Sequence, residues 1–203
     1  MNSRVSGTLA LAAFLLFVSA DVSNSHPHVF IQNSLRIVFD QQGLAGVRVK
    51  WVFDEFFTSM IADEFDKNHN NKLEKPEIID IEKGAFANLV KFNYFSSIKI
   101  NREAFTVEYV RDFSASLAGG NLIYNFVIPC HVKAITTFKE FVISQYDPTY
   151  YTRVAFAKDR PVSLEGAPAF EVSYRISKNV KEAYYYGQVH PVEVILKFKR
   201  RHG

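Results

Sequence analysis

The sequence predicts a mainly β protein of the α+β class, in which an antiparallel, sandwich-like sheet carries an inserted helix-loop-helix. Short stretches of alternating apolar and polar residues recur along most of the chain, and the period changes to that of a helix only within 54–95. A chain of 203 residues with 48% hydrophobic residues is long enough to bury a sizeable core. We therefore expect 26–203 to form one domain with 54–95 as a helical insertion.

Residues 1–25 are typical of an export signal that is removed after translocation. Arg4 precedes an apolar stretch from Leu9 to Val18, which is too short for a membrane span of about 20 helical residues. Small residues then permit cleavage after Ala20 or after Ser25. We therefore expect a periplasmic protein that does not itself span the membrane.

The first patterns after this segment predict a hairpin followed by two helices. Alternation over 35–39 and again over 47–53 indicates two paired strands with one buried face. A four-residue period then begins at Phe57, behind Asp54 or Thr58 as the helix cap, and a second helical pattern begins at Pro76. Further strands are expected at 98–100, 105–109, 122–128, 141–146, 154–156, 170–176 and 192–198.

Composition and missing motifs exclude several classes of protein. The net charge is only +3, and no basic run interleaved with aromatic residues precedes the last few residues, so nucleic acid is not an expected partner. Cys130 is the single cysteine, which excludes an internal disulfide framework. The sequence also lacks a nucleophile elbow, a zinc-protease helix and a phosphate loop. We therefore expect a protein that is not an enzyme.

The segment from Asp66 to Glu77 fits the twelve-residue calcium loop of an EF-hand. Calcium prefers six to eight oxygen ligands, and such a loop turns its odd positions inward. The ligand positions are occupied by Asp66, Asn68, Asn70, Lys72 through its carbonyl, Glu74 and Glu77. Position 6, usually glycine, is Asn71, which tolerates a left-handed backbone. With three carboxylates we expect weak calcium binding, at about 10⁻⁴ to 10⁻³ M; the alternative is a polar turn that binds nothing.

A second candidate site is the pair His26 and His28 at the start of the mature chain. Residues i and i+2 of an extended segment project to one side, and two imidazoles suit Zn²⁺, Ni²⁺, Co²⁺ or Cu²⁺. If cleavage follows Ser25, the free amine of His26 supplies a third ligand. Otherwise the third ligand must come from elsewhere, and the candidates by residue type are His131, His190, Asp54 and Glu55. The alternative is a pair of ordinary exposed histidines beside an edge strand.

Several motifs in this order resemble the bacterial exported family named domain of unknown function 1007, described as a periplasmic component of an uncharacterised ABC-type transport system. They are His26-Pro27-His28-Val29-Phe30-Ile31, Phe39-Asp40 with Gly43-Leu44, Trp51-Val52-Phe53-Asp54-Glu55-Phe56, the calcium-type loop and Tyr146-Asp147-Pro148-Thr149-Tyr150-Tyr151. The family's genes often lie beside nickel/cobalt-type permeases or zinc-responsive genes. The resemblance therefore implies an accessory role in metal transport, with an inner-membrane permease as partner and no biochemical activity attached.

Three hypotheses remain, and they differ in the metal that each requires. The first is a periplasmic accessory protein of a nickel, cobalt or zinc type transport system, which binds the ion at His26 and His28. The second is a calcium-stabilised structural or interaction domain with no role for a transition metal. The third is a copper protein with a histidine brace, which requires the mature chain to begin at His26.

Overall fold

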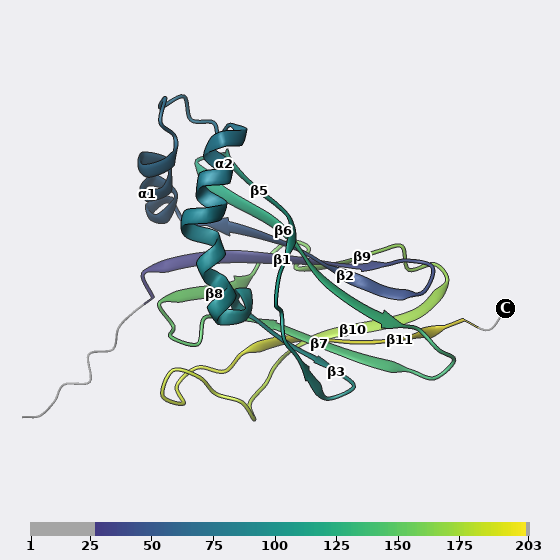
Figure 1. The fold of residues 1–203 in the computed structure, drawn as a ribbon. Coiled ribbons are helices and arrows are strands. Elements are labelled where there is room, and N and C mark those ends of the chain that lie inside the picture. The colour runs from purple at the N-terminus through teal and green to yellow at the C-terminus, as the bar shows by residue number, and fades with distance from the viewer. Residues whose placement is uncertain (1–26, 202–203) are drawn as a thin grey trace, which may run out of the picture.

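The computed structural model describes residues 27–201, which form a mainly β protein with two α-helices and two sheets (Figure 1). The strands are β1 (Val29–Phe39), β2 (Gly43–Phe53), β3 (Ser96–Ile100), β4 (Glu103–Phe105), β5 (Arg111–Ala118), β6 (Asn121–Lys133), β7 (Lys139–Gln145), β8 (Thr152–Phe156), β9 (Val162–Glu165), β10 (Phe170–Lys178) and β11 (Val192–Arg200). The helices are α1 (Glu55–Phe65) and α2 (Lys75–Ile81), and α2 continues into a π-helical turn η1 (Glu82–Phe86) and a 3-10 segment η2 (Ala87–Phe95).

One sheet is antiparallel and the other is mixed. The antiparallel sheet has the order β10-β11-β7-β3-β4, and the mixed sheet has the order β5-β6-β2-β1-β8 with β9 also paired to β1. β1 runs antiparallel to β2 but parallel to β8 and β9. The expectation of an antiparallel sheet is therefore confirmed for one of the two sheets, and the other differs from it by its parallel β1–β8 and β1–β9 pairs. A parallel partner returns through a long crossover, and the local pattern of a strand does not reveal such a connection.

The core lies between the two layers. Alternate residues of β1 and β2 are buried, among them Ile37 and the fully buried Trp51, as the sequence period predicted. Phe39 of the mixed sheet lies 5.2 Å and 5.3 Å, between ring centroids, from Phe170 and Phe198 of the antiparallel sheet. Edge-to-face and tilted aromatic pairs of this kind join the layers.

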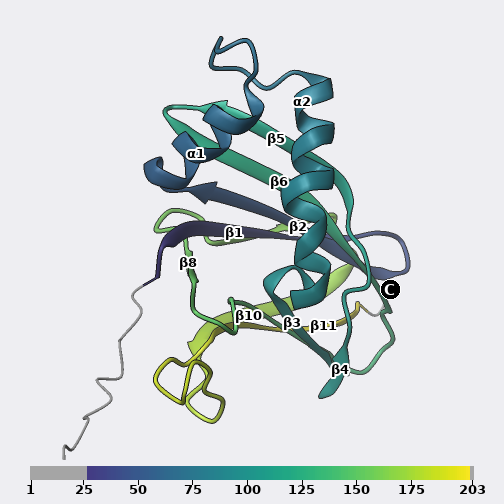
Figure 2. The ribbon, with the colours of Figure 1, turned by 60° about the vertical axis from the view of Figure 1, so that its left-hand side comes forward.

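The helices lie against one part of the mixed sheet, in front of β5, β6 and β2 in Figure 2. Asp54 caps α1, because its Oδ1 accepts the N–H of Phe57 at 2.9 Å. The hydroxyl of Thr58, the alternative cap, instead accepts the N–H of Leu122 on β6 at 2.8 Å. Phe86 of η1 stacks on β5, so the helical segment is packed onto the sheet. None of the helices in residues 27–201 is long and apolar enough to cross a membrane.

Three strand expectations differ from the structure. Of the strand expected at 105–109, only Phe105 belongs to one, because the segment leaves β4 and passes toward β5 without pairing. β5 and β9 were not expected. β5 buries only Ala115 and is broken by a register shift between Arg111 and Ser114, so its alternation is weak. β9 has only four residues, which is too short for a periodic signal.

Two buried amides lie beside Trp51, and they differ in whether the side-chain oxygen is hydrogen-bonded. Gln145 Oε1 accepts the indole N–H of Trp51 at 2.7 Å, and Gln145 Nε2 donates to Ser96 Oγ at 2.7 Å. Asn33 is opposite Trp51 in the β1–β2 register and is only 1% exposed. Its Oδ1 has no hydrogen-bond partner within residues 27–201. An unpaired buried acceptor costs free energy, whereas the Gln145 network is satisfied.

We predict opposite effects of replacing these two amides by leucine. Gln145→Leu leaves the Trp51 N–H without an acceptor and lowers the free energy of unfolding by about 1–3 kcal/mol. Asn33→Leu removes an acceptor that is already unpaired, so stability is unchanged or rises. Urea unfolding followed by Trp51 fluorescence checks both variants, and a larger loss for Asn33→Leu than for Gln145→Leu would contradict this account.

Candidate functional site

His28 lies exposed immediately before β1 and is fixed to the segment that precedes β8. Its backbone N–H donates to the carbonyl of Tyr151 at 2.9 Å, and the N–H of Val29 donates to the same oxygen at 3.3 Å. The imidazole lies against the ring of Tyr151, with 5.0 Å between the centroids. The position of His28 is therefore set by its neighbours, while its ring stays open to solvent.

The loop that carries Tyr151 is organised by one buried carboxylate. Asp147 is 3% exposed, and its Oδ1 accepts both the N–H and the hydroxyl of Thr149 at 2.8 and 2.7 Å. Its Oδ2 accepts the N–H of Thr152, the first residue of β8, at 2.9 Å. Charge-assisted hydrogen bonds of this kind are stronger than neutral ones. The sequence marked Asp147 only as part of the motif from Tyr146 to Tyr151, and nothing local revealed that the carboxylate is buried.

A second carboxylate joins the start of β1 to the start of α1. Asp54 Oδ2 accepts the N–H of Phe30, and the N–H of Asp54 donates to the carbonyl of Phe30 at 3.0 Å. The other oxygen of the same carboxylate caps α1. Three separate motifs, at 28–30, 54–57 and 147–152, therefore meet at one end of the mixed sheet.

An apolar cavity of about 340 Å³ lies behind this junction, between the sheet and the helical segment. Val29, Phe57, Phe86, Tyr124 and Tyr151 are among the residues that line it. The hydroxyl of Tyr124 is buried and has no partner within residues 27–201, and burial raises its pKa above the ordinary tyrosine value. The cavity therefore gives the junction a mainly apolar wall.

The other histidines proposed as ligands lie elsewhere. His131 is on β6 near the Gly43 end of the sheet, and the Nδ1 of His190 is hydrogen-bonded to the carbonyl of Glu182 at 2.7 Å. The backbone N–H of Asp54 donates to the carbonyl of Phe30, two residues after His28. Both carboxylate oxygens of Asp54 accept hydrogen bonds. His26 lies outside the described residues. Within 27–201, no group of three or more His, Cys, Asp or Glu side chains is arranged to hold a metal ion.

The calcium-type loop is closed by hydrogen bonds from its own backbone. Asp66, 2% exposed, accepts the N–H groups of Asn70 and Asn71 at 3.2 and 2.8 Å. Glu77, 7% exposed, accepts those of Lys67 and Glu74 at 3.0 and 2.9 Å. Asn71 has a φ of 60°, the left-handed conformation expected at position 6. Calcium binding by this loop stays a prediction.

The side chains of the same loop converge on Glu74. Asn70 Nδ2 donates to Glu74 Oε1 at 2.8 Å, and Asn68 Nδ2 donates to Oε2 at 3.4 Å. The hydrogen bond from Asn70 is the largest cause that lowers the pKa of Glu74. Lys72, whose carbonyl was proposed as a ligand, donates its N–H to Asn70 Oδ1 at 2.8 Å. The residues predicted as calcium ligands therefore lie close together, and side-chain and backbone N–H groups of the loop donate hydrogen bonds to their oxygens.

The fold and the junction of the three motifs define a two-sheet β domain with a helical segment between β2 and β3. The chain belongs to the family described as protein of unknown function (DUF1007), whose model matches residues 10–197.

Two relatives also match most of the chain. An uncharacterised 15.5 kDa protein from the trpE 3′ region of Spirochaeta aurantia is 29% identical over 132 residues, which cover 65% of this chain and 93% of that protein. An uncharacterised protein of Haemophilus influenzae is 26% identical over 167 residues, which cover 82% of this chain and 80% of that protein.

We predict that Asn70→Ala raises the pKa of Glu74 toward the ordinary carboxyl value, because the main donor to its carboxylate is lost. A lowered pKa in the folded state stabilises the loop above the ordinary pKa, and this contribution is lost as the pH falls through the folded value. Carboxyl NMR titration of the metal-free protein measures the change. Asn88→Ala, an amide on the exposed side of η2, is the control and leaves the titration of Glu74 unchanged.

Proposed function

We propose that this protein is a periplasmic accessory component of a divalent transition-metal transport system, which binds the ion at its N-terminal histidines and docks on an inner-membrane permease. The observation that carries the proposal is the convergence of three motifs on His28. A surface histidine without a function does not require a fixed backbone, whereas a metal-binding histidine binds more tightly when its backbone is held in place. The same motifs carry the family resemblance.

The chemistry of the end that carries His28 suits reversible binding. One ordered imidazole and a second one from His26 offer nitrogen donors for Zn²⁺, Ni²⁺ or Co²⁺, with Asp54 and Glu55 as candidate oxygen donors by residue type. An incomplete ligand set leaves a coordination position for a donor from the partner, which favours transfer of the ion over permanent retention. In this proposal the sandwich-like body is a carrier scaffold and the protein is not an enzyme.

We expect chelator-stripped protein that begins at residue 26 to bind Zn²⁺, Ni²⁺ or Co²⁺ stoichiometrically in a calorimetric titration. His26→Ala/His28→Ala abolishes this binding, because both imidazoles are lost. His131→Ala/His190→Ala, which removes the same number of imidazoles elsewhere, retains it. Metal binding that persists in His26→Ala/His28→Ala, or that is lost in His131→Ala/His190→Ala, would refute the assignment.

The same titration separates the histidine-brace copper protein from the carrier. A brace needs the free amine of His26, so one additional alanine placed before His26 abolishes copper binding while both imidazoles remain. A carrier that uses the imidazoles alone keeps its affinity after this extension. The intact mass of the exported protein establishes where the mature chain begins.

A calcium-stabilised interaction domain is the second candidate, and the left-handed Asn71 favours it. In this proposal the loop from Asp66 to Glu77 holds calcium as a staple between α1 and α2. The buried carboxylates of Asp66 and Glu77 would exchange backbone donors for the ion. The ion would then strengthen the connection between the helices without serving as cargo.

For this second candidate we expect 10 mM Ca²⁺ to stabilise the protein by about 1.4–2.7 kcal/mol, from dissociation constants of about 10⁻³ to 10⁻⁴ M. Glu77→Gln removes the stabilisation, and Glu82→Gln, an exposed carboxylate one turn further on, retains it. Thermal unfolding in Ca²⁺ and in chelator measures both. An equal melting temperature of the wild-type protein under both conditions would exclude the calcium staple.

A further inference from the structure

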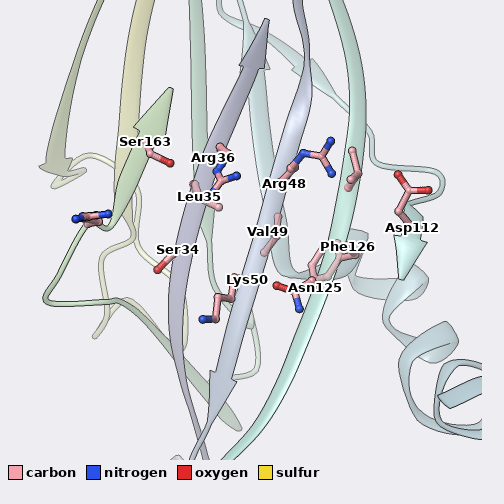
Figure 3. Close-up of a pocket in the computed structure, with 12 residues that line it drawn as sticks. Ser34, Leu35, Arg36, Arg48, Val49, Lys50, Asp112, Asn125, Phe126 and Ser163 are labelled. Carbon is pink, nitrogen blue, oxygen red and sulfur yellow. The ribbon is translucent and has the colours of Figure 1, made fainter. Parts of the chain in front are cut away.

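A hollow of about 370 Å³ lies on the outward face of the mixed sheet, away from the histidines and the calcium-type loop. Figure 3 shows the side chains of Arg36, Arg48 and Lys50 extending from β1 and β2, with Asn125 and Ser163 on the neighbouring strands. Ser34, Asp112 and Arg160 also line it. We propose that this hollow binds a phosphate ester, carried by a small soluble ligand or by a phospholipid headgroup.

The two arginines of the hollow are placed against each other by the strand register. Arg36 is directly opposite Arg48 in the β1–β2 pair, and like charges at such positions destabilise a sheet. Glu165 lies between them, 3.4 Å from Arg36 Nη1 and 3.8 Å from Arg48 Nε. One carboxylate thus holds two guanidinium groups side by side and leaves most of their N–H donors available.

Within residues 27–201, the remaining cations of the hollow have no ion-pair partner. Lys50, opposite Ser34 and Asn125 in the register, forms no salt bridge with any residue of 27–201, and neither does Arg160. Arg160 has a φ of 47°, an uncommon conformation for a residue other than glycine. The hollow therefore combines four cations with Asp112 and the bridging Glu165, and two positive charges are left without a counterpart.

The donors identify the ligand class. Two guanidinium groups and an ammonium group match the oxygens of a phosphate, since guanidinium groups bind phosphate in pairs of parallel hydrogen bonds. Ser34, Ser163 and Asn125 add neutral donors around the same space. The aromatic residue of the hollow, Phe126, is 1% exposed and belongs to the core, so no ring is available for stacking on a nucleic-acid base. A compact anionic phosphate group fits this arrangement.

This inference does not depend on metal binding, and its test uses the mature chain in two arms. The first arm titrates methyl phosphate into the protein at low ionic strength in a calorimeter. The second measures sedimentation with vesicles of phosphatidylglycerol, compared with phosphatidylcholine. Binding of methyl phosphate identifies a soluble ligand, and binding to phosphatidylglycerol vesicles alone identifies a headgroup.

The variant Lys50→Ala/Arg160→Ala removes the two unpaired cations, and we expect binding at least about tenfold weaker, because each bond to a charged group is strong. The control Arg175→Ala/Lys178→Ala removes the same charge from exposed positions on β10 of the other sheet and retains the affinity. Absence of binding in both arms, or an equal loss in both variants, would overturn the proposal.

Discussion

Strand β1 is paired along both of its edges, and the rest of the molecule is arranged around this constraint. β2 occupies one edge in antiparallel register, while β8 and β9 occupy successive parts of the other in parallel. The parallel partners follow β3, β4 and β7 of the antiparallel sheet in the chain, so they pair with β1 across a long sequence separation. The buried carboxylate of Asp147 fixes the point at which β8 enters, and this placement determines what lies next to His28.

The local sequence pattern was sufficient to predict those elements whose structure depends mainly on their own residues. The alternation that ends at Phe39 and Phe53 specified β1 and β2 with their buried faces, and Asp54 stood where a helix cap belongs. It was insufficient for β5, whose alternation is interrupted by a register shift, and for the four-residue β9, which pairs with the distant β1. Strand order and direction follow from long-range contacts, which leave no local period.

The candidate site likewise combines features that the local sequence predicts with features that depend on long-range contacts. The sequence singled out His28, Asp54 and the motif around Asp147 as separate features, and Asp54 has the capping role expected of it. Their meeting depends on the parallel β1–β8 pairing, which the sequence did not predict. The loop from Asp66 to Glu77 differs, since all its candidate ligands are within twelve residues, and the left-handed Asn71 could be anticipated from spacing alone.

The alternation along β1 also shows how the two proposed ligand-binding regions, at His28 and at the hollow, are placed relative to each other. Odd-numbered residues of β1, including Asn33, enter the core, and even-numbered ones, including Arg36, face outward. His28 is exposed and continues the even series just before the strand. At about 3.3 Å per residue, eight residues separate His28 from Arg36 by roughly 26 Å along the same face. A surface rich in phosphate esters that contacts the hollow would therefore face the same side as the histidine, which is the geometry required if a metal ion is to pass between this protein and a membrane-embedded partner.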